Sequence, residues 1–126
     1  MNKSDRLSKN FLRSEFACKC GCGKDNISET LVNQLQRARD LLGVSIIVTS
    51  GCRCLTWNSH EGGSDTSAHL DGLASDIVVH SNETRYLLVC ALLNSGFQRI
   101  GLGEGFVHVD VDYNRPTPSM FLYPTE

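Results

Sequence analysis

The stretch FVHVDVD, residues 106–112, alternates apolar and polar side chains and predicts a β-strand. One face of this strand would carry three valines that should contact the core: Val107, Val109 and Val111. The other face would carry an aromatic ring, an imidazole and two carboxylates: Phe106, His108, Asp110 and Asp112. Taken alone, a solvated surface histidine would also produce this second face, so its meaning depends on the rest of the chain.

Two segments have the spacing of amphipathic helices. Residues 28–43, SETLVNQLQRARDLLG, begin with Ser28 as an N-cap and end at Gly43, with apolar residues recurring at helical intervals. Residues 83–96, ETRYLLVCALLNSG, follow another serine N-cap and also end in a glycine. We therefore expect one helix in each segment.

Three further segments predict strands: residues 45–51 (SIIVTSG), 73–80 (LASDIVVH) and 99–103 (RIGLG). A tight turn would join the last of them to residues 106–112. Residues 56–72 are mostly polar and glycine-rich and predict a long irregular loop, and loops of this length are usually functional. All prolines lie near the C-terminus, so we expect the last ten residues to form loop, with at most a short edge strand at 120–123.

Together these segments predict an α+β fold. The order is helix, strand, long loop, strand, helix, strand, strand, which favours a mostly antiparallel sheet with both helices packed on one face. The other face, which carries His108, would then be open to a cleft. A chain of 126 residues has the usual size of one domain, so we expect a single domain over residues 1–126.

Composition and charge exclude several classes of function. The 12 Lys and Arg residues against 14 Asp and Glu residues give a net charge of -2, which offers no electrostatic footprint for nucleic acid or an anionic membrane. No apolar run approaches the roughly 18 residues of a membrane helix. The N-terminus, MNKSDRLSKN, lacks the apolar centre of a secretion signal, so we expect a protein made in the cytoplasm.

A candidate metal site follows from SAHLDGLASDIVV, residues 67–79. His69 ends the predicted loop, and Asp76 lies inside the next strand, where aspartate is unfavourable. A partly buried carboxylate needs a positive partner or a metal ion to offset its desolvation. With His108, these residues make a set of two histidines and one carboxylate, which is typical of catalytic zinc with a fourth position left for water.

These motifs resemble those of the zinc peptidases of peptidase family M15. That family contains D-alanyl-D-alanine carboxypeptidases, vancomycin-resistance dipeptidases and phage L-alanyl-D-glutamate endopeptidases, and its signature is S-x-H-x-x-G-x-A-x-D followed by H-x-D. The chain supplies every fixed position: Ser67, His69, Gly72, Ala74, Asp76, His108 and Asp110. The resemblance covers residues 16–112, and the compact length looks most like the short phage and prophage members.

The resemblance implies a fold, a cofactor and a set of roles. The fold would be that of the D-Ala-D-Ala carboxypeptidase and Hedgehog-like peptidases, and the cofactor would be Zn²⁺ bound by His69, Asp76 and His108. Asp110 lies one strand repeat beyond His108 and would accept a hydrogen bond from a ligand imidazole. Arg53, in TSGCRC, would bind a substrate carbonyl or carboxylate and stabilise the oxyanion, whereas without the resemblance a surface salt bridge would explain it.

Two further roles are less directly implied. Ser67 would hydrogen-bond near the metal and substrate, or would simply order the loop before His69. The family usually places its general base three residues before the last histidine, where this chain has Gly105. The neighbouring acid, Glu104, is therefore our candidate base, since a shift of one residue across a glycine-rich turn is sterically feasible. The loop holds two weaker alternatives: Glu61 and Asp71.

Six cysteines are many for this length. Five form two groups: Cys18, Cys20 and Cys22 in ACKCGCG, and Cys52 and Cys54 in SGCRC. Three interpretations stay open, namely a structural zinc site that lacks the usual C-x₂-C spacing, a disulfide between the groups, or free thiols packed close together. Cys90 lies alone in a predicted helix and is typical of a small core residue.

The sequence therefore predicts a zinc metallopeptidase that hydrolyses peptidoglycan stem peptides, as a D,D-carboxypeptidase or an L-Ala-D-Glu-type endopeptidase. Its partner would be a peptidoglycan peptide, and we expect a monomer that acts on the cell wall after lysis-linked release or as a virion component. One alternative is a non-catalytic zinc-binding cell-wall or virion module, because the acid at Glu104 is displaced from the family position. Another is a thiol-rich structural domain in which the histidines are incidental.

Overall fold

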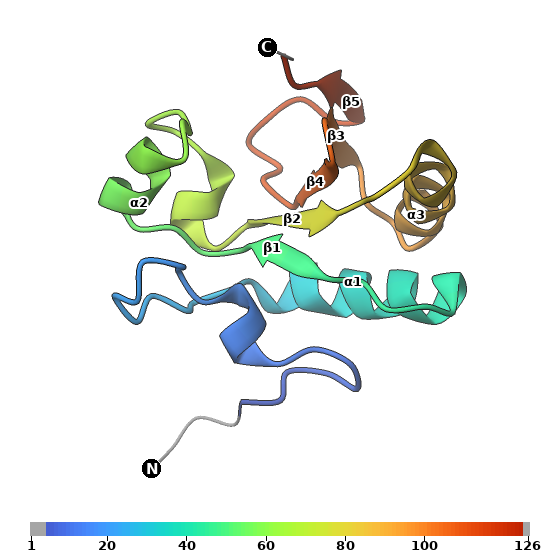
Figure 1. Ribbon diagram of the computed structural model, residues 1–126, viewed down its shortest axis with the longest axis horizontal. Helices are drawn as coiled ribbons and strands as arrows, with labels where there is room; N and C mark the ends of the chain where they lie inside the picture. Colours follow the sequence, from blue (N-terminus) through green and yellow to red (C-terminus); the bar gives the residue numbers. More distant parts are fainter. Residues whose placement is uncertain (1–4, 125–126) are drawn as a thin grey trace.

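The computed structural model describes residues 5–124 and has an α+β architecture (Figure 1). Its strands form one five-stranded sheet in the order β1-β2-β4-β3-β5. The strands are β1 (Val48–Ser50), β2 (Ala74–Val78), β3 (Arg99–Gly103), β4 (Phe106–Asp110) and β5 (Ser119–Leu122). The single domain expected over residues 1–126 includes residues 1–4 and 125–126, which lie outside the described range.

The central strand is β4. Its apolar side chains face the core, and its polar side chains face the opposite side of the sheet. It pairs antiparallel with both β2 and β3. Val107 and Val109 are completely buried on the core face, as the alternation predicted. Asp76 of β2 lies directly opposite His108, and directly opposed residues of neighbouring strands project from the same face. The register of the sheet therefore brings two of the predicted metal ligands together.

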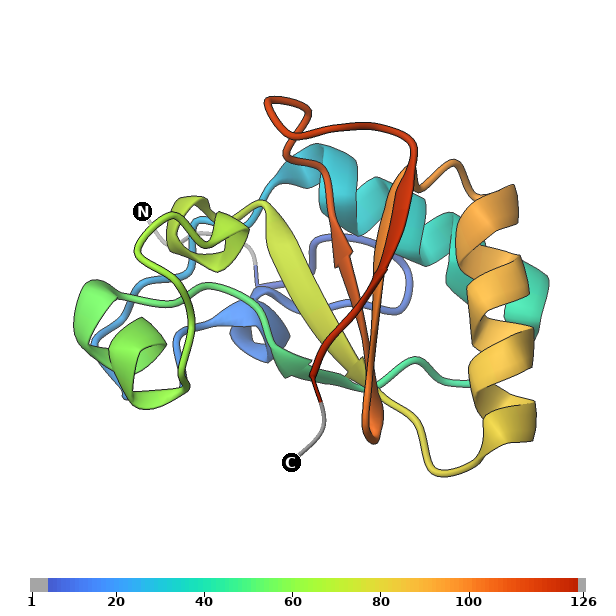
Figure 2. The ribbon, with the colours of Figure 1, turned by 90° about the horizontal axis from the view of Figure 1, so that it is seen from above.

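Two long helices, α1 (Glu29–Leu42) and α3 (Asn82–Asn94), contact each other and share the apolar core with the sheet (Figure 2). The predictions of both helices are confirmed, with the expected serine N-caps, although the C-cap of α3 is Ser95, one residue before the expected Gly96. Ser28 accepts a hydrogen bond from the backbone of Leu31, and Gly43 ends α1 in the left-handed conformation at φ 78°. No helix among residues 5–124 is long and apolar enough to cross a membrane.

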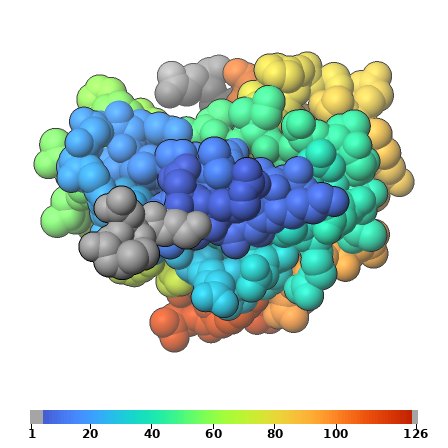
Figure 3. All heavy atoms as spheres, turned by 90° about the horizontal axis from the view of Figure 1, so that it is seen from below, coloured from blue at the N-terminus to red at the C-terminus, as the bar shows by residue number. Residues whose placement is uncertain are grey.

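The segment before α1 is also part of the core. It contains a short 3₁₀ helix, η1 (Arg13–Phe16), that the sequence did not predict. Phe11 and Phe16 are almost completely buried, and Figure 3 shows this blue N-terminal segment lying across α1 and the green segment that follows it. Gly51 allows this segment to approach closely, because an added Cβ there would lie 2.8 Å from the Phe16 backbone.

The prediction of one irregular loop over residues 56–72 is wrong. This segment contains most of a short helix, α2 (Leu55–His60), and a 3₁₀ turn, η2 (Ala68–Asp71). Side chains cap both elements, since Cys54 Sγ accepts from the Trp57 N–H and Ser67 Oγ accepts from the His69 N–H. Elements of four to six residues are too short to show a helical period in the sequence.

The sheet is mixed because β5 runs parallel to β3, whereas the other three strand pairs are antiparallel. The edge strand expected near residues 120–123 is present. In the β3–β5 register, Phe121 lies opposite Gly101. An added Cβ at Gly101 would lie 2.6 Å from the rings of both Phe121 and Tyr123, so the missing side chain leaves room for these aromatic rings on the open face.

Candidate metal centre

His69, Asp76 and His108 converge on one point of the open sheet face. Asp76 Oδ1 lies 3.3 Å from His69 Nε2 and 3.0 Å from His108 Nδ1, and all three side chains are buried. Two ligand atoms placed about 2.1 Å from one tetrahedral ion lie about 3.4 Å from each other. The observed separations are therefore close to those that a single metal ion requires.

Three different elements carry these residues. Asp76 and His108 lie on neighbouring strands, β2 and β4, whereas His69 lies in η2. Gly72 ends η2 at a positive φ of 70°, and an added Cβ there would lie 2.2 Å from the Asn26 carbonyl oxygen. Glycine is therefore required three residues after His69 to turn the chain from η2 into β2.

A hydrogen-bond acceptor holds the outer nitrogen of each imidazole. His69 Nδ1 lies 2.6 Å from the Gly51 carbonyl oxygen, and His108 Nε2 lies 2.8 Å from Asp110 Oδ2. A carbonyl or carboxylate oxygen cannot donate, so in the tautomer that can bind a metal each neutral ring carries its N–H on this outer side. The inner nitrogens then present lone pairs to Asp76 Oδ1, which is also an acceptor. A cation between these three atoms removes their repulsion, so the set fits a divalent ion.

The titration of the buried groups follows from the same contacts. Burial raises the pKa of the Asp76 carboxyl, but hydrogen bonds to His108 and His69 outweigh this effect and hold the pKa well below its usual range. Burial lowers the pKa of His108, but hydrogen bonds to Asp110 and Asp76 outweigh it and raise the pKa. A metal ion must therefore displace a proton that His108 holds more tightly than a free histidine does.

Two buried arginines hold the carboxylates of the site. Arg53 Nη2 lies 3.1 Å from Asp76 Oδ2, the oxygen turned away from the histidines. Arg99 Nε donates to Asp110 Oδ1 at 2.7 Å and so orients the carboxylate that holds His108. The Arg53 side chain is only 10% exposed, so its salt bridge with Asp76 is a buried one and not the surface one of the alternative interpretation.

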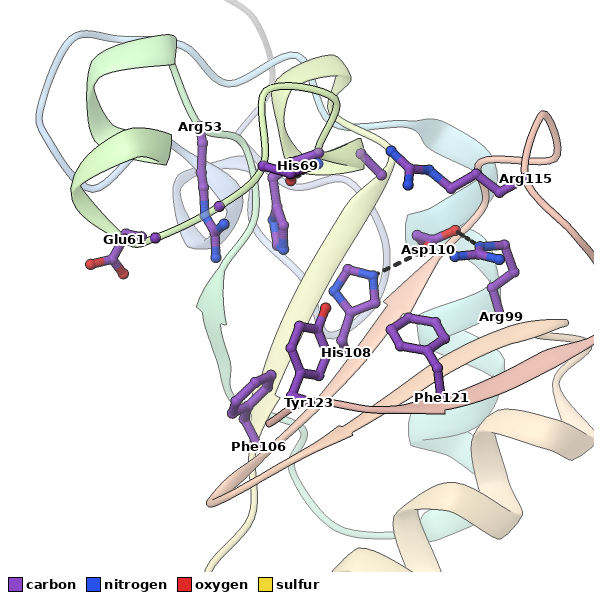
Figure 4. A pocket seen from close by; sticks show the side chains of 15 residues that line it. Arg53, Glu61, His69, Arg99, Phe106, His108, Asp110, Arg115, Phe121 and Tyr123 are labelled. Carbon is purple, nitrogen blue, oxygen red and sulfur yellow. Dashed lines mark hydrogen bonds and ion pairs between the residues drawn. The ribbon is translucent and has the colours of Figure 1, made fainter. Parts of the chain in front are cut away.

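A cavity of about 340 Å³ opens over the site (Figure 4). Three arginines and three aromatic rings are among its lining residues, which are Arg53, Glu61, Gly62, Gly63, Ser64, Ser67, Ala68, His69, Arg99, Phe106, His108, Asp110, Arg115, Phe121 and Tyr123. In Figure 4, His69 and His108 lie next to each other, and Tyr123 and Phe121 lie beside His108. The cavity thus exposes the ligand cluster to a substrate from the open side of the sheet.

The structure places the remaining predicted residues differently. Ser67 lines the cavity and also accepts from the His69 N–H at 3.2 Å. Glu104 is exposed in the β3–β4 turn and lines a separate depression with Arg85. The strands stay paired up to Gly103, opposite Phe106, so the turn carries Glu104 beyond the end of the sheet instead of into the cavity. Glu61, a weaker alternative in the sequence, lies at the cavity rim.

Among the charged and aromatic residues of the cavity, four were not identified from the sequence: Arg99, Arg115, Phe121 and Tyr123. Arg99 is the first residue of an otherwise apolar strand, so the sequence pattern did not indicate that it belongs to the site. The two aromatic residues alternate in the C-terminal segment FLY, and that alternation was the available signal for a strand with rings on one face. Arg115 donates to Asp112 Oδ2 and to the Thr66 carbonyl, so it links the loop after β4 to the loop before η2.

An α+β chain in which two histidines and an aspartate converge at the floor of an open cavity has the layout of a mononuclear metallohydrolase. The family model for Peptidase M15 matches residues 9–110, which include all three candidate ligands. The chain therefore belongs to the Peptidase M15 family, and this membership implies a metallopeptidase. No curated protein matched the chain in the comparison.

Proposed function

We propose that this protein is a zinc peptidase that hydrolyses peptide bonds in the stem peptides of peptidoglycan. The observation that carries the proposal is the convergence of His69, Asp76 and His108, with the outer atom of each side chain already held by another group. The signature motifs shared with the family support peptidoglycan as the substrate class. The protein would reach the cell wall after lysis-linked release or as part of a virion.

The donor set fits zinc better than a hard cation such as Mg²⁺ or Ca²⁺. Two imidazole nitrogens and one carboxylate oxygen are typical zinc ligands, whereas Mg²⁺ and Ca²⁺ prefer oxygen ligands alone. When bound, zinc would supply an activated water molecule and polarise the amide carbonyl of the substrate. His69, Asp76 and His108 would hold the ion, and Asp110 would keep His108 in the tautomer that leaves Nδ1 free to coordinate it.

Arginines of the cavity would bind the oxygen atoms of the substrate. Arg53 donates from Nε to Ser50 Oγ, from Nη1 to Asn58 Oδ1 and from Nη2 to Asp76 Oδ2. A guanidinium has five N–H groups, so among residues 5–124 two remain to donate to a carbonyl oxygen or to the oxyanion that forms from it. Arg115 lines the cavity with a partly exposed side chain, and it would bind a carboxylate of the stem peptide.

An acid must accept the proton of the attacking water and return it to the amine that leaves. Glu61 lines the cavity, whereas Glu104 lies in the exposed turn, and this difference favours Glu61 as the proton acceptor. In Figure 4 the Glu61 carboxylate points away from His69, so it would reach the substrate by rotation of its flexible side chain. The variants Glu61→Gln and Glu104→Gln are matched controls for each other.

The test is digestion of purified peptidoglycan followed by mass analysis of the products. Wild-type protein should release fragments cut within the stem peptide, and His69→Ala should release none. Loss of a general base typically reduces the rate by about 10²–10⁴-fold, so Glu61→Gln should fall by that amount and Glu104→Gln should stay near wild type. The reverse ranking would return the role to Glu104, and activity in His69→Ala would refute the proposal.

The second candidate is a zinc-binding cell-wall or virion module without catalysis. The observation that favours it is the outward direction of the Glu61 carboxylate, together with the distance of Glu104 from the cavity along the β3–β4 hairpin. This alternative predicts that wild-type protein binds zinc through His69 and His108 but releases no peptide fragments. The same digestion therefore separates the two functions.

A further inference from the structure

A second cluster of potential metal ligands lies outside the cavity. Four cysteines bring their sulfur atoms within 4.8 Å of one another: Cys18, Cys20, Cys22 and Cys54. The first three belong to the loop between η1 and α1, and the fourth precedes α2. Cys18 is buried, but Cys20 and Cys22 are exposed, so packing in the core does not account for the cluster as a whole.

The distances among three of the four thiols match tetrahedral coordination. The Sγ atoms of Cys18 and Cys20 are 3.5 Å apart, those of Cys20 and Cys54 are 3.6 Å apart, and those of Cys18 and Cys54 are 3.9 Å apart. Four sulfurs about 2.3 Å from one zinc ion lie about 3.8 Å from each other. A disulfide requires about 2.05 Å, and all four cysteines are free in the structure.

The backbone shapes the loop so that alternate cysteines face one side. Gly21 and Gly23 have positive φ values of 85° and 92°, and each lies beside a cysteine of the cluster. The Cys18 N–H donates to the Lys24 carbonyl at 2.8 Å and closes the loop. These two glycines thus allow a tight turn that other residues would adopt only with strain.

Backbone N–H groups also point at the sulfur atoms. The Cys54 N–H donates to Cys18 Sγ at 3.4 Å, and the Trp57 N–H donates to Cys54 Sγ at 3.5 Å. Hydrogen bonds of this kind stabilise thiolate charge. Lys19 and Lys24 lie in the same loop, so basic side chains accompany the four thiols.

We propose that Cys18, Cys20, Cys22 and Cys54 form a second, structural zinc site of the four-thiolate type. The site would tie the N-terminal loop to the chain at the start of α2. Cys54 directly follows Arg53, and Gly51 accepts the hydrogen bond from His69, so the zinc would also fix the segment that supports the catalytic cavity. Cys52 lies in the same segment but is buried in the core and is not part of the cluster.

The test is the zinc content of the full chain, purified under reducing conditions, together with the spectrum of its cobalt form. Wild-type protein should bind two zinc ions per chain, and Cys20→Ser/Cys22→Ser should bind one, because three nitrogen and oxygen ligands remain at the other site. Cobalt-substituted wild type should show the intense thiolate charge-transfer absorption of a sulfur-ligated ion, and the double variant should lose it.

Two controls keep the result specific. Cys90→Ser replaces a half-buried cysteine of α3 outside the cluster and should keep two zinc ions and the cobalt spectrum. His69→Ala should lose one zinc ion but keep the thiolate absorption. The proposal is overturned if the double variant keeps two zinc ions, or if reduced wild type lacks the thiolate absorption. It is also overturned if reduced Cys20 and Cys22 react with alkylating reagent at the same rate in the metal-free protein and after two equivalents of zinc, enough to fill both sites, have been added.

Discussion

Replacing Asp110 by asparagine should weaken zinc binding without abolishing it. The Asp110 carboxylate accepts hydrogen bonds at both oxygens, from His108 Nε2 at 2.8 Å and from Arg99 Nε at 2.7 Å. Asparagine has a single acceptor oxygen. If that oxygen faces Arg99, the amide N–H₂ faces His108 and favours the tautomer that carries its proton on Nδ1, where the metal should bind.

The expected loss of zinc affinity follows from the role of Asp110 as the hydrogen-bond partner of a candidate zinc ligand. Loss of an outer partner of a metal-bound histidine typically costs 10- to 100-fold in metal affinity, which corresponds to about 1.4–2.8 kcal/mol. Asparagine keeps the volume of aspartate, so the loss reports charge and proton position instead of packing. We therefore expect zinc affinity at the His–Asp–His site to fall by about 10- to 100-fold.

Competition with a chromophoric chelator would measure this affinity, in the Cys20→Ser/Cys22→Ser background so that only one site is titrated. The matched control is Asp112→Asn, because Asp112 is also buried and paired with an arginine, Arg115, but has no contact with His108. Wild-type affinity in Asp110→Asn, or an equal loss in Asp112→Asn, would refute the reasoning.

Three other predictions follow from single contacts. Arg53→Lys removes the planar group that contacts three partners, so kcat/KM for peptide hydrolysis should fall by about 10²-fold, and an unchanged value would exclude a role in binding the transition state. The metal-free protein should lose stability as the pH rises from about 6.5, because His108 has a raised pKa and its contacts stabilise the fold only while the ring is protonated. Urea unfolding across this pH range measures the loss. A stability that does not change with pH, and that His108→Gln leaves unaltered, would contradict the prediction. Gly51→Ala places a Cβ 2.8 Å from the Phe16 backbone and should destabilise the fold by about 1–3 kcal/mol in denaturant titrations, whereas an unshifted midpoint would show that the two segments separate easily.

The sequence predicted those helices and strands whose ends and buried faces are set by residues close together in the chain. The serine caps and terminal glycines located α1 and α3, and the alternation around His108 located β4 and its core face. The short elements α2 and η2 were missed because side-chain caps and tertiary contacts stabilise them instead of a repeating pattern. The parallel pairing of β5 with β3 likewise depends on contacts between segments far apart in the chain.

Some residues of the candidate site were likewise predictable from the sequence, and others were not. Motif spacing indicated His69, Asp76 and His108, and the register of β2 and β4 explains why two of them meet. The sequence did not reveal that Arg99 orients Asp110, because their pairing crosses the β3–β4 hairpin. The direction of the turn also decides the position of Glu104, and spacing alone could not predict that direction.

The cysteines illustrate the limit of spacing rules. The arrangement C-x-C-x-C with a distant C-x-C left a zinc site, a disulfide and free thiols open. Cys52 and Cys54 are two residues apart, yet only Cys54 joins the cluster, because Cys52 turns into the core. The choice of ligands therefore depends on the direction in which each side chain leaves the backbone.

The central claim is that an ion held by His69, Asp76 and His108 is required for hydrolysis of a stem peptide. The most direct test is to strip the wild-type protein with a chelator, return zinc in steps, and follow cleavage of a defined muropeptide by mass spectrometry. We expect no cleavage by the stripped protein, a rate that rises until the His–Asp–His site is filled, and none at any zinc level in His108→Ala. Cleavage by the stripped protein, or by zinc-treated His108→Ala, would contradict the claim.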